Sequence, residues 1–237
     1  MATLLSALET QARRHLTEST ASFWSSAELV DIMNHGIKDL WRDVVDLKAE
    51  HFLTNDTTNV SMAANTATLT GVPADVHKVY LVAPLNAGVN ETNEGVIFAP
   101  LDYNHKIFQG AMTQSAVDPQ NTIIYYSITG AGAPTGTSST VIYVAPQITS
   151  AMDIRFVYVP SLAAKTASDN NPIPGESDQA VIAWTVAYAR AKEREDGSPD
   201  PAWLQMYSTE KQHILQSLGL RQYHEPKFVD AMFEELW

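Results

Sequence analysis

Paired carboxylates are the side chains of this chain whose types and spacing come nearest to a catalytic arrangement. A glycosidase needs only two acids held at a fixed separation, one of them protonated. The candidate groups are Glu91 with Glu94, Glu193 with Glu195 and Asp196, and Glu234 with Glu235. The middle group alternates with basic residues, which is typical of a solvated helix surface. We interpret all three groups as surface charge, and a site completed across two subunits is the alternative.

The residues needed for other catalytic and metal-binding sites are missing from the sequence. The chain has no cysteine, which excludes a thiol nucleophile and a thiolate metal site. The seven histidines show no paired helical spacing; they are His15, His35, His51, His77, His105, His213 and His224. The glycine-rich stretch 130–136 is followed by strand-type residues and lacks a lysine, so it predicts a hairpin loop rather than a phosphate-binding loop. We predict no enzyme, no catalytic residue, no metal site and no cofactor.

The charge of the chain limits its function further. Its 237 residues carry a formal net charge of −12, and the excess acid is spread along the sequence. Because no segment carries a basic stripe, ordinary binding to nucleic-acid phosphates is not expected. An acidic conduit would instead let DNA pass without binding to its wall. The longest apolar run, residues 180–191, is shorter than the roughly 20 residues of a membrane span, and the first residues show no secretory signal, so no contact with a membrane is expected.

The hydrophobic period changes twice along the chain. Helical spacing predicts a first helix over about 3–16 and a second over 26–50, where Ser25 and Glu28 have the spacing of a capping box. Strand-type spacing follows between residues 55 and 162, with turn residues between the strands. The seven candidate strands are Asn59–Met62, Thr66–Leu69, Val76–Val82, Val96–Ala99, Thr122–Ile128, Thr140–Val144 and Asp153–Val159. A short helix is expected within them, over 101–110.

Helical spacing returns after residue 168. The first of two helices is predicted from an apolar face formed by Val181, Trp184, Ala187, Tyr188 and Ala191. The next helix begins at Pro201 and ends near Gly219. The second of these carries Trp203, Met206, Tyr207, Ile214 and Leu215. The order of elements predicts an α+β fold, a helical bundle built from N- and C-terminal helices with an inserted antiparallel β-sandwich or barrel module. We expect N-terminal bundle helices over 1–54, the β module over 55–165, C-terminal bundle helices over 166–219 and a docking segment over 220–237.

The docking segment is predicted from an apolar stripe near the C-terminus. Six apolar residues recur at the spacing of one helix face; they are Phe228, Val229, Met232, Phe233, Leu236 and Trp237. A free helix of about 12 residues is marginal in water, so this one must pack against something. It either covers its own bundle or fills a groove on a partner. We favour the partner.

Several local patterns, in this order, resemble one known family. They are Trp24–Leu29 before a long helix, Pro73–Val76 before Lys78–Val82, Ile142–Pro146, Ile154–Val159 with Pro160, and Ile173–Pro174 before the alanine-rich helix and Trp203–Leu215. Their order over nearly the full chain is similar to the head-to-tail adaptors of podoviruses and related tailed phages, also called connector or tail tubular protein A-like proteins.

This resemblance implies a structural virion protein. In that family the subunits form a ring, usually of twelve, which docks beneath the portal protein and continues the DNA channel. The ring also carries the downstream tail or nozzle protein, and the C-terminal segment commonly reaches the portal. The resemblance therefore places this chain at the head–tail junction of the virion, after synthesis in the host cytoplasm.

Two alternatives belong to other classes of protein. The first is a phage-associated peptidoglycan hydrolase, which would use the paired carboxylates as acid and base. The second is a tail module that binds a glycan or a receptor, for which Tyr125 and Tyr126 would supply a stacking surface. Alternation of these two tyrosines between core and solvent favours an ordinary strand.

Overall fold

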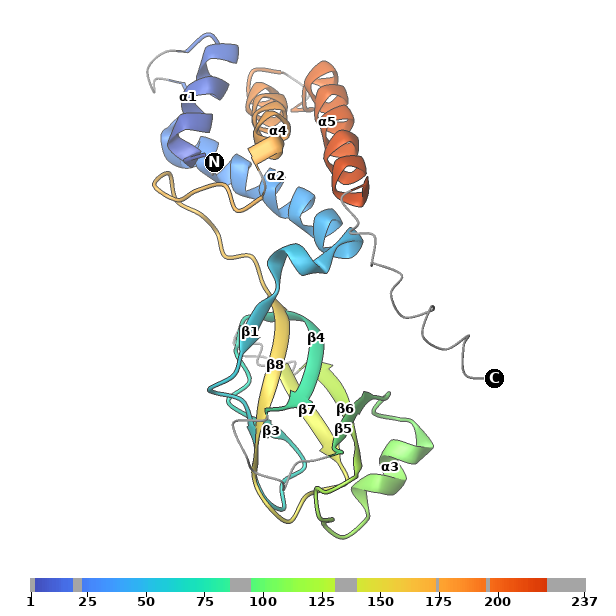
Figure 1. The fold of residues 1–237 in the computed structure, drawn as a ribbon. Helices are drawn as coiled ribbons and strands as arrows, with labels where there is room; N and C mark the ends of the chain where they lie inside the picture. The colour runs from blue at the N-terminus through green and yellow to red at the C-terminus, as the bar shows by residue number, and fades with distance from the viewer. Residues whose placement is uncertain are drawn as a thin grey trace, which may run out of the picture. The chain divides into compact units, whose positions relative to one another are not determined.

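A computed structural model describes residues 3–18, 23–85, 95–130, 140–173, 175–194 and 197–220. The chain divides into two compact units (Figure 1). The helical unit contains the described residues of Met1–His51 and Leu162–Trp237, and the β unit is Phe52–Ser161. The predicted α+β fold is confirmed, because a β module is inserted between N- and C-terminal helices that pack together.

Helix α2 (Ser26–Leu47) begins where the sequence predicts. The Ser25 hydroxyl accepts a hydrogen bond from the Glu28 amide at 3.2 Å, which satisfies one of the free N–H groups at the helix start. The buried side of α2 follows the helical spacing of its apolar residues, among them Leu29, Met33 and Ile37, which are fully buried. The capping box and the apolar period together explain the position of this helix.

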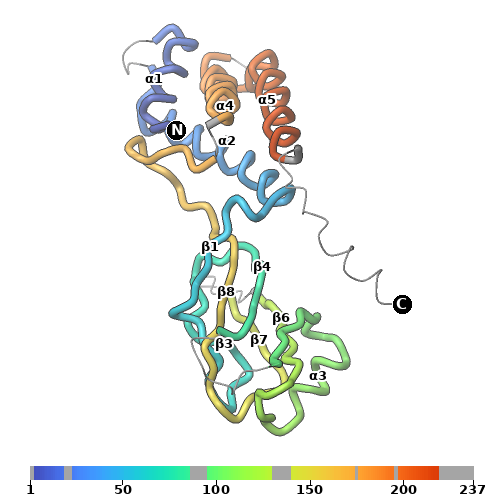
Figure 2. Tube along the Cα trace, in the orientation of Figure 1, coloured from blue at the N-terminus to red at the C-terminus, as the bar shows by residue number. Residues whose placement is uncertain are grey.

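Helix α4 (Asp178–Ala191) lies at the centre of the helical unit. It packs against α1 (Leu5–His15), α2 and α5 (Pro201–Leu220), as the tube in Figure 2 shows. Most of its side chains are buried, and many of them are alanine or valine, which lets the neighbouring helices approach closely. The chain thus builds its helical core around an element encoded near its C-terminal end.

The return segment, residues 162–173, is attached to the helical unit by backbone hydrogen bonds. Helix α1 has no side-chain cap, but the amides of Leu5 and Ser6 donate to the carbonyls of Asp169 and Ala167 at 2.9 and 3.0 Å. These bonds satisfy N–H groups that a helix start leaves free. The return segment therefore caps a helix that precedes it by about 160 residues.

The described residues of the β unit form eight strands. They are β1 (Thr54–Asp56), β2 (Ser61–Met62), β3 (Leu69–Thr70), β4 (Val76–Pro84), β5 (Ile97–Pro100), β6 (Ile123–Gly130), β7 (Thr140–Ala145) and β8 (Met152–Pro160). Strand β8 pairs antiparallel with β1, β2 and β4, and β3 pairs with β2. A second sheet has the order β5-β6-β7, in which β5 and β6 are parallel. The module is thus mixed rather than purely antiparallel.

The two sheets enclose one apolar core. Its fully buried residues include Met62 from the first sheet and Ile124 and Ile142 from the second, with Phe156 on β8. The amide of Val144 on β7 donates to the Ala67 carbonyl at 2.9 Å and joins the sheets at one side. This junction brings the module close to a barrel.

Helix α3 (Lys106–Met112) covers the other face of the second sheet. Phe108 and Ala111 on α3 pack with Ala145 on β7, and Tyr125 and Tyr143 lie beside them. The helix begins later than the expected range 101–110, because the Nδ1 atom of His105 accepts from the Ile107 amide and caps it there. Among the described helices, none has the length and apolar character to cross a membrane.

Candidate docking surfaces

The predicted docking segment lies outside the described residues. Phe228, Val229, Met232, Phe233, Leu236 and Trp237 all belong to residues 221–237. Its role stays a prediction. The described chain ends in α5, the helix that directly precedes this segment.

Most of the candidate paired carboxylates lie outside the described residues. Glu91, Glu94, Glu195, Asp196, Glu234 and Glu235 lie outside the described residues. Glu193 is described and is exposed after the end of α4. Nothing in the described part of the chain therefore holds two of these acids at a catalytic separation.

The histidines are spread over both units. The six described ones are exposed, and His224 lies outside the described residues. His15 packs its ring against Trp203, with ring centroids 4.9 Å apart. Over the described ranges, no three side chains of His, Asp or Glu gather in a way that could hold a metal ion.

The two neighbouring tyrosines of β6 point to opposite faces of their sheet. Tyr126 is buried in the core between the sheets, where burial raises the pKa of its hydroxyl. Tyr125 packs beside α3. They do not form a common stacking surface, which removes the feature on which the glycan-binding alternative depended. The glycine-rich loop beyond Gly130 lies outside the described residues, up to residue 139.

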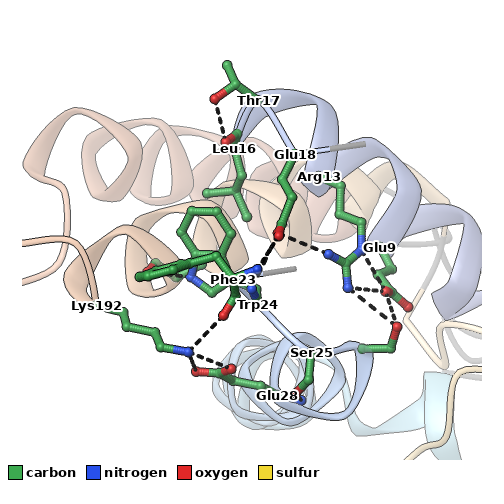
Figure 3. Close-up of polar contacts among 12 residues, drawn as sticks. Glu9, Arg13, Leu16, Thr17, Glu18, Phe23, Trp24, Ser25, Glu28 and Lys192 are labelled. Carbon is green, nitrogen blue, oxygen red and sulfur yellow. Dashed lines mark hydrogen bonds and ion pairs between the residues drawn. The ribbon is translucent and has the colours of Figure 1, made fainter. Parts of the chain in front are cut away.

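A buried charged cluster joins α1 to the start of α2 (Figure 3). The Arg13 guanidinium donates to Glu9 from Nε at 2.9 Å and pairs with Glu18 through Nη1 at 3.1 Å. Ser26 donates to Glu9 at 2.7 Å, and Glu18 accepts from the backbone amides of Phe23 and Trp24. Because a buried ion pair needs all of its partners, this cluster fixes the geometry of the α1–α2 connection more than it adds stability.

This cluster was not predicted from the sequence, although the sequence contains a signal for it. Glu9 and Arg13 are spaced four residues apart and lie beside Leu5, Leu8 and Ala12, the buried positions of α1. Opposite charges inside an apolar helix stripe indicate a buried pair rather than a solvated one.

A basic side chain from the end of α4 completes the same region. Lys192 pairs with Glu28 at 3.0 Å, donates to the Phe23 carbonyl at 3.0 Å and lies 4.9 Å from the centre of the Phe23 ring. The indole of Trp24 donates to the Ala189 carbonyl at 3.0 Å. The entry to α2 is thus tied to the end of α4 by several directional contacts (Figure 3).

A second polar cluster joins α2 to α5. The hydroxyl of Tyr207 donates to Asp39 at 2.6 Å, and Lys211 pairs with Asp39 at 2.8 Å and with Asp43 at 2.6 Å. Burial alone would raise the pKa of Asp39, but hydrogen bonds from Lys211 and Tyr207, together with the charges of Lys211 and Arg42, outweigh it and hold this pKa below its ordinary value. Burial and the nearby Asp39 carboxylate raise the pKa of Tyr207. The cluster fixes the register between the two helices.

The polar groups of these two clusters connect the helices of the helical unit. Their hydrogen bonds and ion pairs join α1, α2, α4 and α5 to one another. The class of protein follows from the family comparison: a family model described as SU10 adaptor protein matches residues 3–226.

The chain belongs to the SU10 adaptor protein family and is a phage head-to-tail adaptor. This membership confirms the resemblance found in the sequence, and it implies a structural role, a location in the virion and binding to other virion proteins. No curated protein matches the chain. The family match ends at residue 226, so the apolar stripe of residues 228–237 lies beyond it. The docking role of that stripe rests on its own sequence pattern.

Proposed function

We propose that copies of this chain close into a ring beneath the portal protein, at the head–tail junction. The ring, of twelve subunits as in the family that the sequence resembles, continues the DNA channel and offers a platform to the downstream tail or nozzle protein. The observation that carries this proposal is membership of the adaptor family over residues 3–226. The subunit would reach the virion after synthesis in the host cytoplasm.

The charge of the chain supports the role of a conduit. DNA carries one negative charge per about 1.7 Å of helix axis, and a wall of the same sign repels it. With a net charge of −12 and no basic stripe, the chain is suited to let DNA slide past without specific binding. The relevant property of the ring is thus low affinity for its cargo.

The packing of the helical unit supports a rigid wall. Helix α4 is enclosed by three helices, and the charged clusters around Arg13 and Asp39 fix their register. A ring under load from packaged DNA needs subunits that hold their shape, and close-packed cores transmit strain rather than absorb it.

We further propose that the segment after α5 docks on the portal. In a helix, Val229, Met232, Phe233 and Leu236 would share one face, while Lys227 and Glu234 would lie on the opposite side. An apolar helix face of this kind fits a groove on a partner protein.

Deletion of residues 226–237 tests this docking. We expect the shortened chain to keep the circular dichroism spectrum of the full chain but to lose its binding to purified portal-containing heads, measured by co-sedimentation. A narrower variant combines Val229→Ser and Phe233→Ser, and its matched control combines Lys227→Gln and Glu234→Gln on the opposite side of the helix. Normal docking of the deletion variant would end the proposal for this segment, and electron microscopy of the wild-type chain on heads tests the ring itself.

A further inference from the structure

The outward side of α5 carries no formal charge. Helix α5 packs on the bundle through Tyr207, Ile214 and Leu218, which are buried. Six exposed residues lie on the opposite side at successive spacings of one and three; they are Gln205, Met206, Thr209, Gln212, His213 and Gln216. We call these six residues the α5 neutral face. Met206, one of the apolar residues from which this helix was predicted, thus lies on the exposed side.

The charged residues of α5 are kept away from this face. Between residues 201 and 218, every Asp, Glu, Lys or Arg is half-buried, and there are two of them, Glu210 and Lys211. Lys211 is turned toward α2, where it pairs with Asp39 and Asp43. No exposed side chain over these eighteen positions is an acid or a strong base.

Helix α2 shows the opposite pattern. Its exposed side carries Asp31, Lys38, Arg42 and Asp46. Both helices are long and both have one buried side, so length and burial do not explain why one outward side is charged and the other is not. In a chain with 18% charged residues, eighteen consecutive helical positions without an exposed Asp, Glu, Lys or Arg require a reason of their own.

We infer that the α5 neutral face contacts a second copy of this chain in the assembled ring, an inference that rests on the proposed function. Two copies with a net charge of −12 repel each other, and repulsion between like charges is largest where the surfaces meet. A face without formal charge is where identical acidic subunits approach at the lowest electrostatic cost. A basic partner would gain more from an acidic face.

The polar groups of this face also lose few hydrogen bonds when a contact excludes water. The hydroxyl of Thr209 donates to the Gln205 carbonyl at 3.0 Å within the helix, and Ser208 at the border of the face donates to Leu204 at 3.0 Å. These hydroxyls keep a partner in a dry contact. The glutamine amides can donate and accept across the contact, and the core of protein interfaces is depleted in Lys, Glu and Asp.

The size of the face fits a contact that forms only during assembly. The face runs over positions 205–216. A helix rises about 1.5 Å per residue and is about 10 Å wide, so the face covers about 180 Å², roughly a quarter of the ~800 Å² that each partner of a stable pair buries. Free copies would therefore stay monomeric. Copies held side by side on a portal would gain the contact at high effective concentration.

Thr209→Glu tests the inference. Thr209 is exposed at the middle of the face, and Glu forms helix at least as well as Thr, so the fold is retained. The size control is Thr209→Gln, which has the same shape without the charge. The location control is Ala27→Glu, which adds the same charge to the exposed first turn of α2, where an acidic side chain is favourable. Each variant is mixed with portal-containing heads that lack this protein, and complete rings are counted by electron microscopy.

We expect Thr209→Glu to lower the fraction of heads with a complete ring by at least about tenfold, while both controls assemble like the wild type. Complete rings with Thr209→Glu at the wild-type frequency would overturn the inference. If such rings also released DNA abnormally, the face would line the channel rather than a contact between subunits, and the inference would again be wrong. Equal loss in Ala27→Glu would also overturn it. Absence of rings with the wild-type chain would instead refute the proposed function, on which the inference depends.

Discussion

Gly36 on α2 faces the indole of Trp184 on α4 at a distance that leaves no room for a side chain. A Cβ atom at Gly36 would lie 2.6 Å from both Cδ1 and Cγ of Trp184. The indole also packs against Tyr188 and Tyr207, with ring centroids 4.3 and 4.9 Å away, so it has little freedom to move aside. Close approach of two helices at this point therefore depends on glycine.

Gly36→Ala should destabilise the helical unit. Overpacking costs about 1–3 kcal/mol, and the better helix propensity of alanine offsets up to about 1 kcal/mol of it. We expect the free energy of unfolding in urea, followed by circular dichroism, to fall by about 1–2 kcal/mol. The control is Gly110→Ala on α3, where a Cβ meets no atom within 4 Å and stability should rise slightly. Equal effects of the two substitutions would contradict this account.

The cluster around Asp39 makes stability depend on pH. Because its folded-state pKa lies below the ordinary value of 3.8, the unfolded chain binds the proton more tightly, and the stabilisation is present above pH 3.8. It is lost as the pH falls through the lower folded-state pKa. We expect Asp39→Asn to be less stable than the wild type at neutral pH, with a difference that shrinks below pH 3.8. Urea unfolding over a pH series measures this difference.

Asp31→Asn is the control for that series. The Asp31 carboxylate is exposed, and the nearest basic partner on its helix is the His35 ring at 4.0 Å. Its substitution should change the free energy of unfolding by less than about 0.5 kcal/mol. A constant difference between wild type and Asp39→Asn down to strongly acidic pH would rule out the titration of Asp39 as its cause.

Some individual residues could be predicted from the sequence and others could not. The helix cap at Ser25 was predicted correctly, because the start of a helix is specified by residues within one turn of it. The partners of Asp39 could not be predicted, since Tyr207 and Lys211 follow it by about 170 residues. The six residues of the docking segment stay a prediction.

Among the elements, the return segment has a consequence for α1. The side-chain amide of Asn34 on α2 donates to the Lys165 carbonyl and its oxygen accepts from the Lys165 amide, both at 2.8 Å. This pair of bonds holds the segment whose carbonyls cap Leu5 and Ser6. Asn34 therefore stabilises the start of α1 indirectly, by holding the return segment in place.

Asn34→Ala should release the N-terminal end of α1. Without the two bonds to Lys165, the segment opens more often, and the amides of Leu5 and Ser6 lose their partners in each opening. We expect hydrogen exchange at these two amides to accelerate by at least about tenfold, while amides in the middle of α5 change little. Asn55→Ala is the control, because Asn55 lies in the β unit and accepts one long bond of 3.4 Å from Arg155. Unchanged exchange at Leu5 and Ser6 would mean that Asn34 does not support the cap.

The strands show what a local pattern can and cannot predict. Strand β8 was predicted nearly at its observed bounds, because alternating apolar residues mark a strand with a buried face. Strand β1 was missed, since two of its three residues, Asn55 and Asp56, favour turns. The parallel pairing of β5 with β6 was not foreseen, because spacing along one strand does not record the direction of its neighbour.

At the scale of the whole molecule, the chain enters and leaves the β unit at neighbouring points. Strand β1 pairs with β8, and Thr54 lies opposite Tyr158. The two ends of Phe52–Ser161 are thus held together by the sheet itself. All five tryptophans lie outside this range, so tryptophan fluorescence follows the helical unit alone.

Residues 52–161, produced alone, should fold. The unit has its own core, and its ends need no support from the helices. We expect a cooperative thermal transition by circular dichroism and dispersed amide resonances. In the full chain, Val82→Ala removes a buried side chain from the β core and should lower the stability of the β unit. The urea transition measured by tryptophan fluorescence should stay unchanged in this variant, because the tryptophans lie in the helical unit. A disordered fragment, or a matching shift of the fluorescence transition, would show that the units are not independent.

The enclosure of α4 by helices from both ends of the chain sets an order of events on the ribosome. Helices α1 and α2 emerge first, but the helix that covers their apolar sides is translated only after the entire β unit. The β unit can therefore complete its folding while the nascent N-terminal helices still expose Leu8, Met33 and Ile37. Host chaperones are expected to hold this exposed stripe during synthesis, and a pause in translation before residue 178 would prolong the period in which the unfinished subunit aggregates.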